Sequence, residues 1–77
     1  MGVKVYSTPT CPWCAKAKEF LKVHKVSFTN VDVSTNKKAA QEMIKKSGQM
    51  GVPVIDVNGQ IVVGFDEGKL KKLLKLK

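Results

Sequence analysis

The stretch Cys11-Pro12-Trp13-Cys14 limits the possible folds of this chain more than any other part of the sequence. It follows a run of alternating apolar residues, Val3 to Tyr6, which predicts a β-strand. Proline is favoured at the first position of a helix, because its missing N–H would have no partner there. The sequence therefore predicts a strand that passes through a short loop into a helix, with Cys11 as the cap of that helix.

The two cysteines of this stretch are the only ones in the chain. Positions i and i+3 share one face of a helix and hold their Cα atoms roughly 5 Å apart, which is close enough for a disulfide. The unpaired amides and the positive end of the helix dipole favour a thiolate at Cys11. We therefore interpret Cys11 and Cys14 as a reversible dithiol–disulfide pair.

Three other roles for these thiols fit the sequence less well. A structural disulfide across so short a loop would stabilise the fold little. A zinc site needs four ligands, and beyond the cysteines the chain offers only His24 and carboxylates, so we expect no metal. A buried, inert pair conflicts with the surface position of a helix start that follows a strand.

Composition narrows the functional class further. We expect the 77 residues to form one domain, residues 1–77. Fourteen lysines face six acidic residues, but arginine, on which nucleic-acid recognition usually relies, is missing. We interpret the lysines as solvated helix faces and expect no nucleic-acid partner. Without a leader or a long apolar run, the chain is expected to be cytoplasmic, monomeric and independent of membranes, and a cysteine pair there is more often catalytic than structural.

The apolar pattern predicts alternating strands and helices. The first helix runs from Pro12 to about Val23, a second strand covers Ser27 to Asp32, and a second helix covers Asn36 to Lys46 and ends at Gly48. The residues expected to face inward are Trp13, Ala17, Phe20 and Leu21 in the first helix, with His24 partly buried at its end, and Ala40, Met43 and Ile44 in the second.

The second half of the chain carries a hairpin signal. Val54 to Val57 and Ile61 to Val63 flank Asn58-Gly59, a dipeptide that suits a type I′ turn. A final helix starts at about Glu67, with Leu70, Leu73 and Leu74 inward. A parallel β-α-β unit followed by this antiparallel hairpin predicts an α/β fold, a mixed four-stranded sheet flanked by three helices.

Three motifs in this order resemble those of the glutaredoxins of the thioredoxin superfamily, and most of all the small bacterial glutaredoxin-like redoxins. They are Thr10-Cys11-Pro12-Trp13-Cys14, Gly51-Val52-Pro53-Val54 and Val63-Gly64-Phe65-Asp66. The resemblance implies a thioredoxin-like fold, a redox-active centre, and thiol–disulfide oxidoreductase activity in electron transport. It also implies glutathione as co-substrate, disulfide-bearing proteins as further partners, and no bound cofactor.

The resemblance also implies roles for individual residues. Cys11 would be the nucleophile and Cys14 the resolving thiol, while Pro53 would be the family's cis-proline beside the Val52 backbone. The other residues implied to bind glutathione are Trp13, Phe65, Asp66, Lys45 and Gln49. Asp66 equally fits the cap of the last helix.

Two alternatives to glutathione-linked reduction remain. Thr8 stands where glutaredoxins commonly carry a basic residue, which favours a thioredoxin-like redoxin reduced by a flavoprotein reductase. A glutaredoxin that bridges an iron–sulfur cluster is the other alternative, and Pro12 argues against it, because cluster binders more often carry a different residue there.

Overall fold

Within residues 2–49 and 51–75, seven helices and strands form in the order predicted. The computed structural model describes residues 2–49 and 51–75. The elements are β1 (Val3–Ser7), α1 (Pro12–Val23), β2 (Thr29–Asp32), α2 (Lys37–Ser47), β3 (Val54–Val57), β4 (Gln60–Val63) and α3 (Glu67–Leu74). β2 begins two residues later than Ser27, because the chain first closes the end of α1. Lys25 takes a left-handed conformation there (φ 56°), and the Val26 amide donates to the Leu21 carbonyl at 2.8 Å.

The four strands form one mixed sheet in the order β2-β1-β3-β4. β1 and β2 are parallel, with Val5 opposite Asn30, whereas β3 is antiparallel to both β1 and β4. The β3–β4 turn has positive φ at Asn58 (51°) and Gly59 (92°), the conformation that the Asn-Gly pair predicted. The mixed four-stranded sheet with three helices is thereby confirmed.

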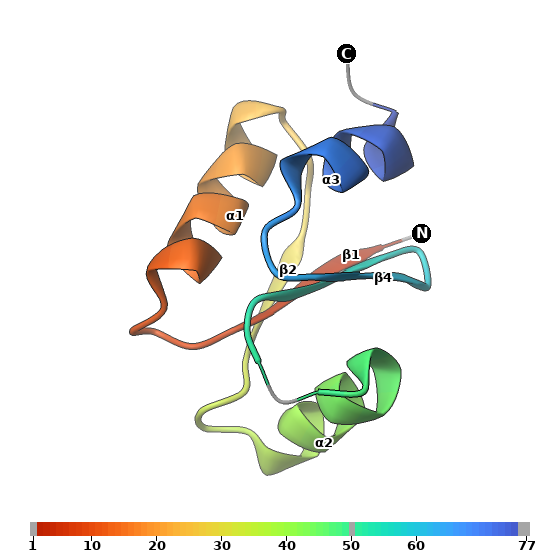
Figure 1. Cartoon of the computed structure of the whole chain (residues 1–77). Helices are drawn as coiled ribbons and strands as arrows, with labels where there is room; N and C mark the ends of the chain where they lie inside the picture. Colours follow the sequence, from red (N-terminus) through yellow and green to blue (C-terminus); the bar gives the residue numbers. More distant parts are fainter. Residues whose placement is uncertain (1, 50, 76–77) are drawn as a thin grey trace.

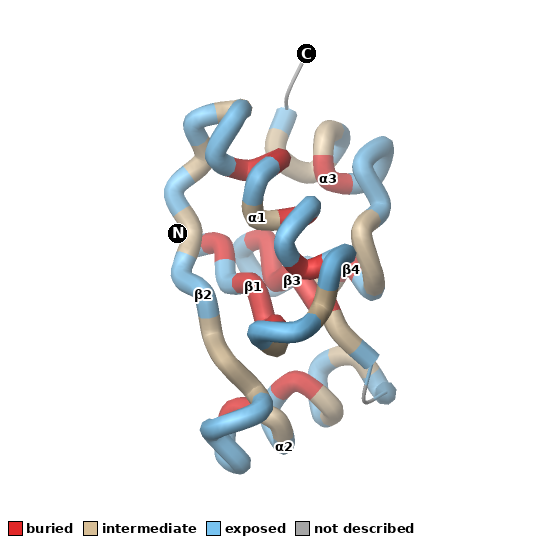
Figure 2. Tube along the Cα trace, turned by 90° about the vertical axis from the view of Figure 1, so that its left-hand side faces the viewer, coloured by how far each residue is buried: buried red, intermediate tan, exposed pale blue. Residues whose placement is uncertain are grey.

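The helices cover the sheet on both faces. Figure 1 shows α1 and α3 on one side of the sheet and α2 on the other. Figure 2 shows the buried residues concentrated in the central strands and on the inner sides of the helices. The larger apolar cluster joins α1 and α3 to the sheet and includes Val5, Leu21, Ile55 and Leu70, with Leu73 and Leu74 packed against it. The smaller one joins α2 to the opposite face through Tyr6, Met43 and Val54.

Of the residues predicted to face inward, Trp13 does not do so and Ala40 does so only in part. Trp13 is 57% exposed, and Cys14 takes the buried position in the first turn of α1. In α2 the buried alanine is Ala39, whereas Ala40 is half-buried. Within residues 2–49 and 51–75, no helix combines the length and the hydropathy that a membrane span requires.

Candidate active site

The thiol pair lies where β1 passes into α1. Cys11 is the N-cap of α1, with extended backbone (φ −93°, ψ 112°), and Pro12 is the first residue of the helix. The Cys11 Sγ accepts a hydrogen bond from the Cys14 backbone amide at 3.1 Å. A second bond, from the Cys11 amide to the Thr8 carbonyl at 3.3 Å, closes the loop behind it. The helix start thus directs the Cys14 backbone N–H toward the Cys11 sulfur, as expected of a helix cap.

The two thiols differ sharply in their surroundings. Cys11 is partly exposed, whereas Cys14 has no exposed surface. Burial, followed by the hydrogen bond with the Cys11 side chain, raises the pKa of Cys14 to about 11. Cys14 is therefore a protonated thiol at neutral pH, and Cys11 is the sulfur that a disulfide can approach from solvent.

A pocket of about 300 Å³ gathers residues from three distant parts of the chain. We call it the redox pocket; its lining residues are Trp13, Val52, Pro53, Gly64 and Phe65. The Val52–Pro53 peptide bond is cis, in agreement with the role that the family resemblance implied for Pro53. The Gly64 amide donates to the Pro53 carbonyl at 2.8 Å, and this bond holds the β4–α3 connection against the loop before β3.

Of the residues expected to bind glutathione, the structure brings Trp13, Val52, Pro53 and Phe65 together in this pocket. Asp66 adjoins Phe65 in the chain and caps α3, since its Oδ1 accepts from the Lys69 amide at 3.1 Å. Lys45 and Gln49 are exposed at the end of α2 and do not line the redox pocket. Gln49 instead lies beside Gly51.

Gly64 is the lining residue that the sequence-based list missed. Its φ of 78° lies in the left-handed region, where glycine is favoured, and no atom approaches within 4 Å of the position that a Cβ would take. Its backbone conformation, rather than close packing, therefore favours glycine. The sequence signal was a glycine between a strand and a helix-capping aspartate.

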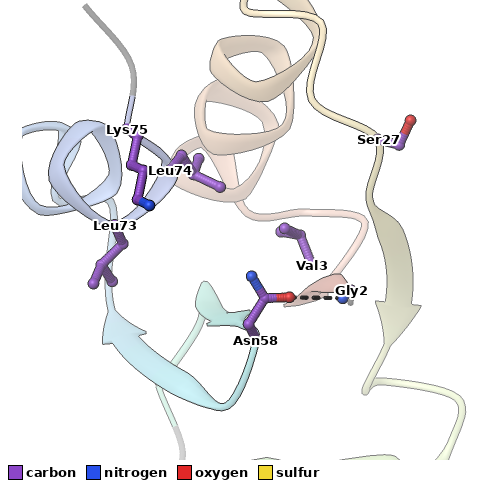
Figure 3. A pocket seen from close by; sticks show the side chains of 7 residues that line it. All are labelled: Gly2, Val3, Ser27, Asn58, Leu73, Leu74 and Lys75. Carbon is purple, nitrogen blue, oxygen red and sulfur yellow. Dashed lines mark hydrogen bonds between the residues drawn. The ribbon is translucent and has the colours of Figure 1, made fainter.

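Another pocket lies away from the thiols. It has a volume of about 410 Å³ and is formed at the start of β1, the opposite end from Cys11, by residues of β1, the β3–β4 turn and the end of α3 (Figure 3). Asn58 Oδ1 accepts there from the Gly2 amide at 2.8 Å. Lys75 is the one ionisable side chain among its lining residues. It contains none of the chemistry of the redox pocket.

Neither the pair nor its surroundings assembles a metal site in the described part of the chain. Across residues 2–49 and 51–75, no three histidine, cysteine, aspartate or glutamate side chains come together as a ligand set. The cysteines are free thiols, and the groups beside them are backbone amides and an aromatic ring. This arrangement suits sulfur exchange.

Comparison with known proteins agrees with this geometry. The family model of glutaredoxin matches residues 3–62. A glutaredoxin-like 8.6 kDa protein of the rubredoxin operon of Clostridium pasteurianum is 48% identical over 95% of this chain and 97% of its own length. Glutaredoxin 3 of Escherichia coli is 38% identical over 96% of this chain and 98% of its own.

Solved structures agree as well. The crystal structure of a thioredoxin-like protein superposes with a TM-score of 0.87 and 32% identity, covering 92% of this chain and 97% of that protein. The thioredoxin-like fold and the domain match point to the same chemistry as the paired thiols at the helix start. This chain belongs to the glutaredoxin family and is a thiol–disulfide oxidoreductase.

Proposed function

We propose that this protein reduces protein disulfides and glutathione mixed disulfides through Cys11 and Cys14, with glutathione as electron donor. The observation that carries the proposal is the contrast between the two thiols. Cys11 is partly exposed and its sulfur accepts from a helix amide at 3.1 Å, while Cys14 is buried and protonated. Cys11 is therefore the attacking sulfur and Cys14 the resolving one.

The first step is the attack of the Cys11 thiolate on one sulfur of the substrate disulfide. The second substrate sulfur leaves as a thiolate and takes a proton from solvent, so that a mixed disulfide links Cys11 to the substrate. The amides of the first turn of α1 stabilise the Cys11 thiolate before the attack. Trp13, in the first turn of α1, and Phe65 form the aromatic part of the redox pocket, in which we place the substrate.

Formation of this mixed disulfide activates Cys14. Burial is the largest cause of its raised pKa, but the hydrogen bond with the Cys11 side chain and the repulsion from Cys11 contribute too. The repulsion disappears once the Cys11 sulfur is bonded to the substrate and can no longer carry a charge, and the hydrogen bond with that sulfur weakens. The Thr8 backbone hydrogen bond and the Lys18 charge, which lower the pKa of Cys14, remain. The resolving thiol thus loses its proton more readily after the first step.

The cycle closes with two further exchanges. The Cys14 thiolate attacks the Cys11 sulfur, which releases the substrate as a dithiol and leaves a Cys11–Cys14 disulfide. One glutathione thiolate then opens that disulfide by bonding to Cys11, and a second removes the first as glutathione disulfide. Two electrons pass from two glutathione molecules to one substrate disulfide.

Glutathione would occupy the redox pocket during this exchange. The Val52 backbone is proposed to pair with its cysteinyl portion, and Phe65 and Asp66 to hold the γ-glutamyl end. Lys45 and Gln49, at the end of α2, are proposed to meet the glycyl carboxylate. The local order supports the first two roles, because Val52 and Phe65 both line the redox pocket and Asp66 adjoins Phe65.

A second donor system is supported by two observations. Thr8, whose carbonyl accepts from the Cys11 amide, offers no positive charge for a glutathione carboxylate. A solved relative at 32% identity is described as thioredoxin-like. Both favour reduction of the Cys11–Cys14 disulfide by a flavoprotein reductase. The chemistry at Cys11 and Cys14 is the same in either case, so only the donor separates the two.

An assay of the electron donor tests the proposal directly. A fixed protein disulfide, such as insulin, is offered with glutathione, glutathione reductase and NADPH, and in parallel with a thioredoxin reductase and NADPH. We expect NADPH consumption with the glutathione system and little with the other. Turnover with the thioredoxin reductase alone would contradict the glutathione proposal and support the second donor system.

A further inference from the structure

A second pocket, of about 350 Å³, opens along α1 next to the redox pocket. We call it the α1 groove. The α1 side supplies Lys16, Glu19, Phe20, Val23 and His24, and the segment that leads into α3 supplies Phe65 and Glu67. Figure 1 shows α1 and α3 side by side on the same face of the sheet.

The α1 groove is continuous with the redox pocket at two points. Phe65 lines both of them. Lys16 lines the groove, and its Nζ lies 4.6 Å from the centroid of the Trp13 ring, which lines the redox pocket. A molecule bound in the redox pocket can therefore extend into the groove without leaving the surface.

The floor of the groove is apolar and aromatic. The rings of Phe20 and Phe65 meet edge to face with centroids 5.6 Å apart, and the His24 ring lies 4.3 Å from that of Phe20. His24 is held by the hydrogen-bond contact of its Nδ1 with the Phe20 carbonyl, at 2.9 Å. Val23 is 69% exposed beside them. Such a surface stabilises an apolar side chain that covers it.

The charges of the groove differ from those of the whole chain. The chain has a net charge of +8 and six acidic residues. Four of them serve internal contacts: Asp32, Glu42, Asp56 and Asp66. The other two, Glu19 and Glu67, both line the groove, where Lys16 is the one lysine. Glu67 forms a long ion pair with Lys71, with 3.6 Å between Oε1 and Nζ, and both side chains are exposed to solvent. Such a pair is weak, so the Glu67 carboxylate remains available to a partner.

We propose that the α1 groove docks the polypeptide of a protein-disulfide substrate, as an extended segment that carries an apolar side chain next to a lysine or arginine. The apolar side chain covers Phe20 and Val23, and the basic one lies between Glu19 and Glu67. The inference rests on the proposed reaction at Cys11. Phe20 lies nine residues along α1 from Cys11, about 14 Å at the helical rise, which four or five extended residues span.

Two peptides with the same internal disulfide test this docking. One carries leucine and lysine four and five residues outside each cysteine, and the other carries serine at those positions. Dithiothreitol serves as final reductant, so that the result does not depend on the donor. We expect the wild-type protein to reduce the first peptide with a kcat/KM about fivefold higher, the gain of one partly buried leucine and one exposed ion pair.

Variants on α1 test whether the preference for the leucine-lysine peptide depends on the groove. Val23→Gln and Glu19→Gln should each lower the preference, because each removes one of its two contributions, whereas Lys22→Gln, an exposed position of the same helix outside the groove, should retain it in full. All three should reduce bis(2-hydroxyethyl) disulfide at the wild-type rate, since it is too small to reach the groove. Equal kcat/KM values for the two peptides, or a preference that survives both substitutions, would overturn the proposal.

Binding without chemistry separates this inference from the proposed reaction. Peptides with serine in place of both cysteines are titrated into the protein and followed by amide NMR shifts. We expect shifts at Val23, His24 and Phe65 with the leucine-lysine peptide and much smaller ones with the serine peptide. If the protein reduces no disulfide but these shifts appear, the reaction is wrong and the groove stands. If reduction proceeds and these shifts are absent, the groove is wrong.

Discussion

The start of α1 and the contact of α2 with the sheet both bring polar groups to the edge of the core, but they bond them very differently. At the α2 contact, Lys46 Nζ reaches Asp56 Oδ2 at 2.8 Å, Glu42 Oε1 at 3.0 Å and the Tyr6 hydroxyl at 3.1 Å. At the start of α1, the Cys11 Sγ accepts from the Cys14 amide and remains partly exposed. One region is tied into a network, and the other leaves its reactive atom accessible.

The difference separates stability from chemistry. Burial alone would raise the pKa of Asp56, but hydrogen bonds from Lys46 and the Gly59 amide outweigh it and leave that pKa below its ordinary value. The same network, led by Asp56, raises the pKa of Lys46. Such a network resists change. In the proposed cycle the sulfur of Cys11 must instead form and break bonds, which a network of this kind would hinder.

The largest effect is expected at Cys11. Cys11→Ser should lower reduction of protein disulfides and of glutathione mixed disulfides to the rate without protein, because a hydroxyl cannot replace the thiolate. Its melting temperature should stay within a few degrees of wild type, since serine also caps helices. Initial rates and thermal melts check both parts. Residual turnover well above background would require another nucleophile.

Cys14→Ser should divide the two activities. Reduction of a glutathione mixed disulfide needs one thiol and should persist, whereas reduction of a protein disulfide should drop by about tenfold or more, because the mixed disulfide with Cys11 can no longer be resolved internally. The trapped complex should be visible by mass spectrometry. Equal losses in both assays would mean that Cys14 does more than resolve.

At the α2 contact, Lys46→Met should act on stability and leave the thiol chemistry intact. Losing a charged hydrogen-bond partner of the buried Asp56 should reduce the free energy of unfolding by about 2 kcal/mol. Lys38→Met, an exposed position of the same helix, is the matched control and should change it little. Urea unfolding at pH 7 measures both variants. A loss of disulfide reduction beyond the unfolded fraction would contradict the separation.

The pH dependence of unfolding sharpens this test. The pKa of Asp56 is lower in the folded protein than in the unfolded chain. The stability that ionised Asp56 provides is therefore present above the ordinary aspartate range and is lost as pH falls through the folded pKa. Because the pKa of Lys46 is raised in the folded protein, the stability that its charged form provides is present at neutral pH and is lost only at strongly alkaline pH. The difference between wild type and Lys46→Met should therefore be largest at neutral pH and shrink toward pH 3.

A smaller effect is expected from Thr8→Lys. Thr8 is half-buried and bonded to the Cys11 amide through its carbonyl, so a lysine there can bring its ammonium near a glutathione carboxylate. The KM for a glutathionylated peptide should fall by about fivefold, as one exposed ion pair provides. Asp66→Asn should raise that KM. If neither variant changes it, glutathione does not occupy the redox pocket as proposed.

The elements of this fold could be predicted where short-range signals fix them. Cys11-Pro12, Asn36, Gly48 and Asn58-Gly59 start or stop an element by their own backbone preferences, and the structure places helix ends or turns there. Helical periodicity alone did not place Trp13. Its neighbours are the Val52–Pro53 loop and Phe65, which only the folded chain brings to α1.

The polar contacts were harder to predict than the elements. Lys45 and Lys46 are adjacent lysines in the last turn of α2, and periodicity does not say which one reaches the sheet. The structure selects Lys46, because it faces Asp56 of β3 and Tyr6 of β1. The α1 groove escaped prediction for the same reason, since Phe20 and Phe65 are distant in sequence and meet only through packing.

The most direct test of the account is the order in which the two thiols react. The reduced protein is treated briefly with iodoacetamide between pH 5 and pH 11, and each cysteine is quantified by peptide mass spectrometry. We predict that Cys11 is alkylated first throughout the neutral range and that Cys14 reacts appreciably only toward its pKa of about 11. Alkylation of Cys14 before Cys11 at neutral pH would contradict the assignment of nucleophile and resolving thiol.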